Sequence, residues 1–77
     1  MLDPVLLEQW KASPSEAERV AARIADELAG KESWHPVDSN PVIATRMDVS
    51  TNTVRRAKSL LELNGVIMKS RSRFYVT

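Results

Sequence analysis

The feature of this sequence that most constrains its fold is a pair of helical segments separated by a very short connection. Ile43 and Met47 lie one helical turn apart before the connection, and Val54 and Leu61 lie two turns apart after it. A connection of about three residues makes two helices cross at a steep angle instead of lying end to end. We therefore expect residues 39–64 to form two short helices packed against each other.

Polar residues with strong local preferences mark the ends of this pair. Ser39 or Asn40 can cap the first helix, with Pro41 in its first turn. Asp48 stands where the chain must turn sharply, and aspartate tolerates the left-handed backbone region better than most residues. Ser50 is expected to cap the second helix. The residues expected to face inward are Ile43, Ala44 and Met47, then Val49 in the turn, then Val54, Ala57, Leu60, Leu61 and Leu63.

Two further helices are predicted upstream. Asp3, followed by proline, is typical of a helix start and predicts a helix over residues 4–11. Ser13 with Glu16 three residues later forms a capping box and predicts a second start. Gly30 can end that helix in the left-handed conformation. Its apolar stripe consists of Ala17, Val20, Ala21, Ile24, Ala25 and Leu28.

The remaining segments lack helical spacing. Residues 31–38 predict a connecting loop, in which Trp34 covers the edge of the core and His35 is exposed or braces the loop. Residues 66–69 and 73–76 are two β-prone runs and predict a hairpin with a basic tip. No glycine lies in its connection, Ser70-Arg71-Ser72, so the pattern leaves the register open.

Together these elements predict a mainly α fold with a small β-hairpin, a winged helix-turn-helix with three core helices and a short N-terminal helix. We divide the chain into an N-terminal helix over residues 1–12 and a winged helix-turn-helix domain over residues 13–77. Leu6, Leu7 and Trp10 are expected to fold back on the core. The alternative is an exposed anchor that pairs with a second copy in a homodimer or binds another protein as an adaptor.

Charge is distributed unevenly along the chain. The net charge is +1, yet residues 1–40 contain eight acidic and four basic residues, whereas residues 41–77 contain seven basic and two acidic residues. Such asymmetry indicates a surface that binds a polyanion. The basic residues of the second half are Arg46, Arg55, Arg56, Lys58, Lys69, Arg71 and Arg73.

The second helix of a helix-turn-helix lies in the major groove of DNA, so its outward side must carry hydrogen-bonding groups. Here that side is predicted to present Thr51, Asn52, Arg55, Arg56 and Lys58. Asn52 can make a bidentate contact to adenine and Arg55 to guanine. The alternative is the ordinary solvated side of an amphipathic helix. The residues predicted to bind double-stranded DNA are Ser39, Ser50, Thr51, Asn52, Thr53, Arg55 and Arg56, with Lys69, Arg71 and Arg73 in the wing.

From Val37 to Val76 the chain resembles the winged-helix domain of the bacterial GntR family of transcription regulators, and the likeness extends back to about residue 15. The residues that carry it are Val37-Asp38-Ser39-Asn40, Arg46-Met47-Asp48-Val49-Ser50, Thr53-Val54-Arg55-Arg56-Ala57, Leu60-Leu61 and Asn64-Gly65-Val66-Ile67. The resemblance implies DNA-binding roles for Ser50, Thr53, Arg55 and Arg71. Arginine is common in the family where this chain has Thr51 and Pro41, and glycine where it has Asp48 and Ser72.

The resemblance also implies a bacterial, cytoplasmic regulator of transcription. Regulators of this family generally carry a C-terminal domain that binds a ligand or dimerises. We therefore expect this chain to be either the DNA-binding part of a longer regulator or a compact protein that consists of a DNA-binding domain alone. In both cases we expect it to bind no small-molecule effector. A small accessory DNA-binding protein of a plasmid or phage has the same sequence features.

Composition argues against other classes of function. The chain has no cysteine and one histidine, which removes disulfides, thiolate zinc sites and cysteine nucleophiles. It contains no Ser, His and Asp set and no phosphate-binding glycine loop. We therefore expect no enzyme activity, no cofactor, no metal and no membrane partner.

Overall fold

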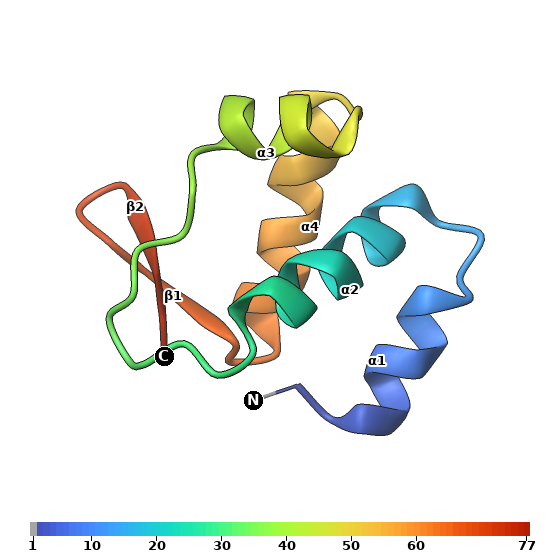
Figure 1. Cartoon of the computed structure of the whole chain (residues 1–77), viewed down its shortest axis with the longest axis horizontal. Coiled ribbons are helices and arrows are strands. Elements are labelled where there is room, and N and C mark those ends of the chain that lie inside the picture. The colour runs from blue at the N-terminus through green and yellow to red at the C-terminus, as the bar shows by residue number, and fades with distance from the viewer. Residues whose placement is uncertain (1) are drawn as a thin grey trace.

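The computed structural model describes residues 2–77 as four helices followed by an antiparallel hairpin (Figure 1). This mainly α architecture with a small hairpin is a winged helix-turn-helix and confirms the predicted fold class. Within the described residues, no helix is both long enough and apolar enough to span a bilayer. The elements are α1 (Pro4–Lys11), α2 (Glu16–Leu28), α3 (Asn40–Met47), α4 (Thr51–Leu63), β1 (Ile67–Ser70) and β2 (Arg73–Val76).

The N-terminal caps of α1 and α2 are made by side chains close in sequence. Asp3 caps α1, its carboxylate accepting a hydrogen bond from the amide of Val5 at 2.8 Å. The expected cap of α2 is wrong by two residues, because Ser15 accepts from the amide of Glu18 and begins the helix. Two capping boxes overlap in this segment, and the structure uses the second. Ser13 instead accepts from the amide of Ser15 and donates to the Glu18 carboxylate.

The core forms where α2 crosses α4, and α3 and β1 close it. Figure 1 shows α4 running behind α2 and α3 lying across the N-terminal end of α4. Inward positions recur at helical spacing, which confirms the predicted stripes on α2, α3 and α4. Leu63 is an exception at 83 % exposure, because it lies about 200° around the helix from Leu61. The largest fully buried side chains are Ile24, Ile43, Val54, Leu61 and Ile67.

The connection between α3 and α4 is the predicted sharp turn. Asp48 adopts the left-handed conformation, with φ 55° and ψ 50°, and ends α3. The amide of Val49 then donates to the carbonyl of Ala44 at 3.0 Å, and the Val49 side chain packs half-buried against the core. Ser50 caps α4 by accepting from the amide of Thr53 at 3.1 Å. The left-handed residue and these three contacts fix the angle between the two helices.

The hairpin is one residue tighter than its sequence suggests, because Ser70 pairs with Arg73. Its turn therefore consists of Arg71 and Ser72, whose φ angles are 51° and 68°. Positive φ at both central residues is what the type I′ turn requires, and its twist matches that of the strands. Glycine is the residue that usually occupies such positions. In this turn Arg71 and Ser72 adopt the left-handed region instead, which is sterically costly for residues with a side chain.

Residues 31–38 form the predicted connection without a helix or strand, and within it residues 34–37 run beside β2. Three main-chain hydrogen bonds of 2.8–3.0 Å join the two segments. The amide of Trp34 donates to the carbonyl of Val76, and the amide of Val76 donates to the carbonyl of His35. The amide of Val37 donates to the carbonyl of Phe74. Pro36 bridges Tyr75 within this stretch. Proline is tolerated at a sheet edge because its missing N–H faces outward.

Trp34 does not cover the core as expected. It is 59 % exposed, with φ 67°, and its ring packs on that of Tyr75 at a centroid distance of 5.6 Å. The edge pairing of residues 34–37 directs the tryptophan to the outer face of the small sheet, where Tyr75 lies opposite. The core beneath is closed by Val76 and Phe74 instead.

Helix α1 packs onto α2, as the first of the two expectations for its apolar side chains requires. Trp10 is 5 % exposed, and Leu6 and Leu7 pack against the core. Lys11 holds the contact with an ion pair of 3.3 Å to Asp26 of α2. The alternative prediction, in which Trp10 belongs to an exposed anchor, is therefore wrong.

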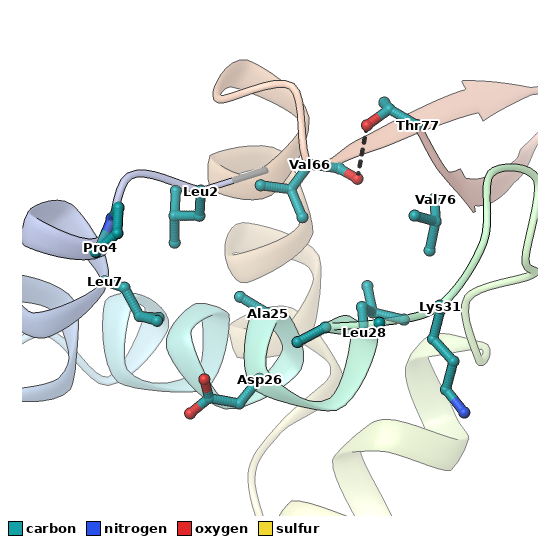
Figure 2. A pocket seen from close by; sticks show the side chains of 12 residues that line it. Leu2, Pro4, Leu7, Ala25, Asp26, Leu28, Lys31, Val66, Val76 and Thr77 are labelled. Atoms are coloured by element: carbon teal, nitrogen blue, oxygen red, sulfur yellow. Dashed lines mark hydrogen bonds between the residues drawn. The ribbon is translucent and has the colours of Figure 1, made fainter.

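An apolar cavity of about 380 Å³ remains between α1, the end of α2 and the base of the hairpin. Figure 2 shows Leu2, Leu7, Leu28, Val66 and Val76 around it, with Asp26 and Lys31 at its rim. Leu2 is itself buried, so the segment before α1 forms part of the wall.

Candidate nucleic-acid interface

Helix α4 has two faces of opposite character. Its inward side is buried through Val54, Ala57 and Leu61. Its first two turns leave polar and basic side chains in solvent on the other side. The exposed members of the predicted set on this helix are Thr51, Asn52, Arg55 and Arg56. The inward side holds the helix to the body while the outward side presents donors and acceptors, which is the arrangement a groove-reading helix needs.

Asn52 and Arg55 form a pair on this surface. The guanidinium Nη1 of Arg55 donates to Oδ1 of Asn52 at 3.1 Å. Positions three apart lie side by side on a helix, so the pair follows from the helical spacing. The hydrogen bond orients both side chains, and it leaves the Asn52 amide nitrogen and the remaining guanidinium donors without a partner from this contact.

Thr53 is placed differently from its neighbours. Its hydroxyl lies 2.9 Å from that of Ser50 and donates to the carboxylate of Glu16 at 3.1 Å. Glu16 belongs to the first turn of α2, so this contact ties the start of α4 to another helix. Thr53, predicted to bind DNA, thus links two helices, and Glu16 is a polar neighbour that the sequence did not reveal because it lies far away along the chain.

The hairpin projects from one side of the helical body and carries the second basic surface (Figure 1). Lys69, Arg71 and Arg73 are all exposed. Within residues 2–77, the ion pairs involve only Lys11 and Arg46 among the basic residues, so the arginines of α4 and the wing have no acidic partner. Unneutralised cations on two adjacent elements favour an anionic ligand.

Arg46 is the basic residue that the fold uses for itself. Its guanidinium bonds Glu27 at 2.8 Å and Asp38 at 2.9 Å, joining α3 to α2 and to the segment before α3. These two carboxylates, Glu27 foremost, raise the pKa of Arg46 further above its ordinary value. Its charge is thereby compensated within the protein.

Lys58 was expected on the outward side of α4 and lies on the inward side. It is 4 % exposed, and its Nζ donates to the main-chain oxygen of Asp38 at 2.7 Å and lies 5.5 Å from the centre of the Phe74 ring. Position 58 is four residues after Val54 and therefore on nearly the same side of the helix. Burial lowers the pKa of Lys58, and the charge of Asp38 partly opposes this shift.

Ser39 stands at the N-terminal end of α3 and is exposed. It is the backbone cap of the helix, yet its hydroxyl makes no capping hydrogen bond. Ser39 and Arg73 both line a hollow of about 520 Å³ between the start of α3 and the wing. The structure therefore brings two of the predicted DNA-binding residues, the cap of α3 and a wing arginine, to the lining of one hollow.

Comparison with known proteins supports the fold. No known protein family and no curated protein matches the sequence significantly. The structure is similar to the crystal structure of a possible transcriptional regulator, YydK, from Bacillus subtilis subsp. subtilis str. 168, with a TM-score of 0.74 and 20 % sequence identity. The match covers 79 % of this chain and 28 % of that one, so this chain corresponds to less than a third of the YydK chain.

Proposed function

We propose that this protein binds double-stranded DNA in a sequence-specific manner and regulates transcription, as a winged-helix protein of the GntR type. In this proposal α4 enters the major groove, and the hairpin tip lies at the adjacent minor groove or its phosphates. The observation that carries the proposal is the outward face of α4, where Asn52 and Arg55 lie paired and no acidic side chain neutralises the arginines.

The chemistry of this face fits base edges in the major groove. Asparagine offers a donor and an acceptor that match adenine, and arginine offers two parallel donors that match guanine. Thr51 precedes them at the very start of the helix, where its methyl group can contact thymine. A helix with these groups in its first two turns can distinguish base pairs and not merely bind a polyanion.

The wing adds a second contact that helps to orient the protein. Arg71 sits in the turn itself and Arg73 follows in β2, so both cations lie at the end of the hairpin farthest from the core. Arginine in a narrow minor groove gains from the strong negative potential there. Contacts of this kind set the register of α4 along the duplex.

Selection of bound duplexes from a random library tests the proposal. We expect enrichment of a short site, together with binding that weakens steeply as salt rises, because counterions are released from each phosphate contacted. Paired inverted half-sites would also indicate a homodimer, for which we propose a contact through the exposed side of α1, which carries Val5. Failure to enrich any site at low salt would contradict the proposal.

Two variants separate the roles of helix and wing. Arg55→Ala should relax the selected sequence at one base position, at a cost of about 1–3 kcal/mol for the preferred base. Arg71→Ala should weaken binding to all duplexes more evenly and reduce the salt dependence by about one phosphate contact. Equal loss of selectivity in both variants would show that α4 does not read bases.

A further inference from the structure

The hollow between α3 and the wing has a buried cation in its wall. It measures about 520 Å³ and lies between the start of α3, the hairpin and α4. Its lining includes Ser39 and Asn40 on one side, Ser72 and Arg73 on the other, and Lys58 with Phe74. Within residues 2–77, Lys58 is the single charged residue whose side chain is buried.

Lys58 has no carboxylate of its own. It donates to the main-chain oxygen of Asp38 at 2.7 Å, whereas the carboxylate of Asp38 is bound by Arg46 at 2.9 Å. An ammonium group has three donors, and this hydrogen bond uses one of them. The Phe74 ring face, 5.5 Å away, supplies only a weak attraction. A buried charge without a counter-ion is costly, so this site is better satisfied with an anion present than without one.

The opposite wall of the hollow is also suited to an anion. The first N–H groups of a helix have no partner within the helix, and in α3 these are the amides of Asn40 and Val42, because Pro41 has no N–H. In α3 the Ser39 side chain makes no capping bond, so its hydroxyl does not satisfy those amides and can itself donate outward. Arg73 is exposed and unpaired across the hollow. Donors thus converge from α3, α4 and the wing.

We propose that this hollow binds one phosphate group of the DNA backbone, with Lys58 as its buried cationic ligand. The inference rests on the proposed function, because the sugar-phosphate strand must cross between a helix in the major groove and a wing in the minor groove. The hollow lies between those two elements. Lys58 then acts as a positioning contact that sets how deeply α4 enters the groove, without reading a base itself.

The variant Lys58→Met tests this role, because methionine keeps the length of the side chain and removes the charge. We expect an affinity for the selected duplex about tenfold lower, and a salt dependence smaller by about one phosphate contact. The matched control is Lys31→Met, an exposed lysine at the rim of the apolar cavity, which should leave both quantities unchanged. Unchanged affinity and salt dependence in Lys58→Met would overturn the inference.

A set of duplexes in which single phosphates are replaced by neutral methylphosphonates locates the contact in the wild-type protein. We expect one replacement to weaken wild-type binding about tenfold and to have no effect on Lys58→Met. If every replacement acts equally on the two proteins, Lys58 serves only to hold the Asp38 carbonyl and the inference is wrong. This cycle remains informative if Lys58→Met melts at a lower temperature, because each protein is compared with itself.

Two controls distinguish failure of the proposed phosphate site from failure of DNA binding itself. Loss of duplex binding by the wild-type protein would refute the proposed function as well, whereas normal binding and a normal effect of Arg55→Ala with an inert Lys58→Met refute the phosphate site alone. Free inorganic phosphate should bind this hollow only weakly. In NMR spectra, the amide signals of Ser39 and Asn40 should therefore not reach saturation at phosphate concentrations up to millimolar. Tight binding of free phosphate would instead identify a small-anion site and overturn the assignment to the DNA backbone.

Discussion

The hairpin turn should be stabilised by the substitution Ser72→Gly. Ser72 has φ 68° and follows Arg71 at φ 51°, so both central residues lie in the region that side chains disfavour. Only glycine enters this region without a clash of its Cβ with the backbone. The strand register, with Ser70 opposite Arg73, forces this conformation because the loop has just two residues.

The magnitude follows from two opposing terms. Relief of the left-handed backbone at Ser72 contributes about 1–2 kcal/mol, and the greater freedom of glycine in the unfolded chain costs about 0.4–1 kcal/mol. The net gain is about 0.5–1 kcal/mol. The unfolding entropy of a 77-residue chain is about 160 cal/mol/K near 60 °C, so the melting temperature should rise by about 3–6 °C.

Thermal unfolding followed by circular dichroism measures this shift, with Ser70→Gly as the matched control. Ser70 is a serine two positions earlier in an ordinary strand conformation, so glycine there should lower the stability by about 0.5–1 kcal/mol. If both glycine variants lower the melting temperature equally, the turn is not strained as argued.

Substitutions at three other positions probe the fold. Because φ at Asp48 is 55°, Asp48→Gly should raise the free energy of unfolding by about 0.5–1 kcal/mol and Asp48→Ala should lower it. Urea unfolding measures both changes, and changes of the same sign would contradict this reasoning. Trp10→Ala should cost about 3–5 kcal/mol, enough to unfold much of so small a domain, and a loss under 1 kcal/mol would show that α1 is not part of the core. Burial lowers the pKa of Lys58 below its unfolded value of 10.5, so between the two pKa values the unfolded state binds more protons. Wild-type stability should therefore rise relative to Lys58→Met as pH increases toward 10.5, in unfolding measured at several pH values, and a falling difference would be inconsistent with a buried ammonium.

The positions of the helices and of the hairpin could be predicted because their signals are local. Asp3 and Ser50 cap helices through hydrogen bonds to residues two or three positions away, and Asp48 turns the chain through its own backbone preference. Helical spacing likewise identified the buried stripes, including Val54 and Leu61, since every such position depends on its neighbours along one helix. The exposed donors Asn52 and Arg55 followed from the same spacing.

Other features depend on which elements meet in space, and no local pattern carries that information. The edge pairing of residues 34–37 with β2 turned Trp34 outward, although its apolar bulk predicted a covered position. The bond between Thr53 and Glu16 joins residues 37 apart in sequence. These contacts became visible only in the folded chain.

Lys58 shows the division most clearly. The sequence by itself determined that a basic residue stands on α4 beside an exposed row of donors, because helical geometry and charge are properties of the segment alone. Only the tertiary structure decided that this lysine lies inward, with the Asp38 carbonyl and the Phe74 ring beside its ammonium group. The carboxylate of Asp38 is bound by Arg46 instead. The physical reason is that a charge is buried or solvated according to what other elements place around it, and those elements lie 16 to 20 residues away in the chain.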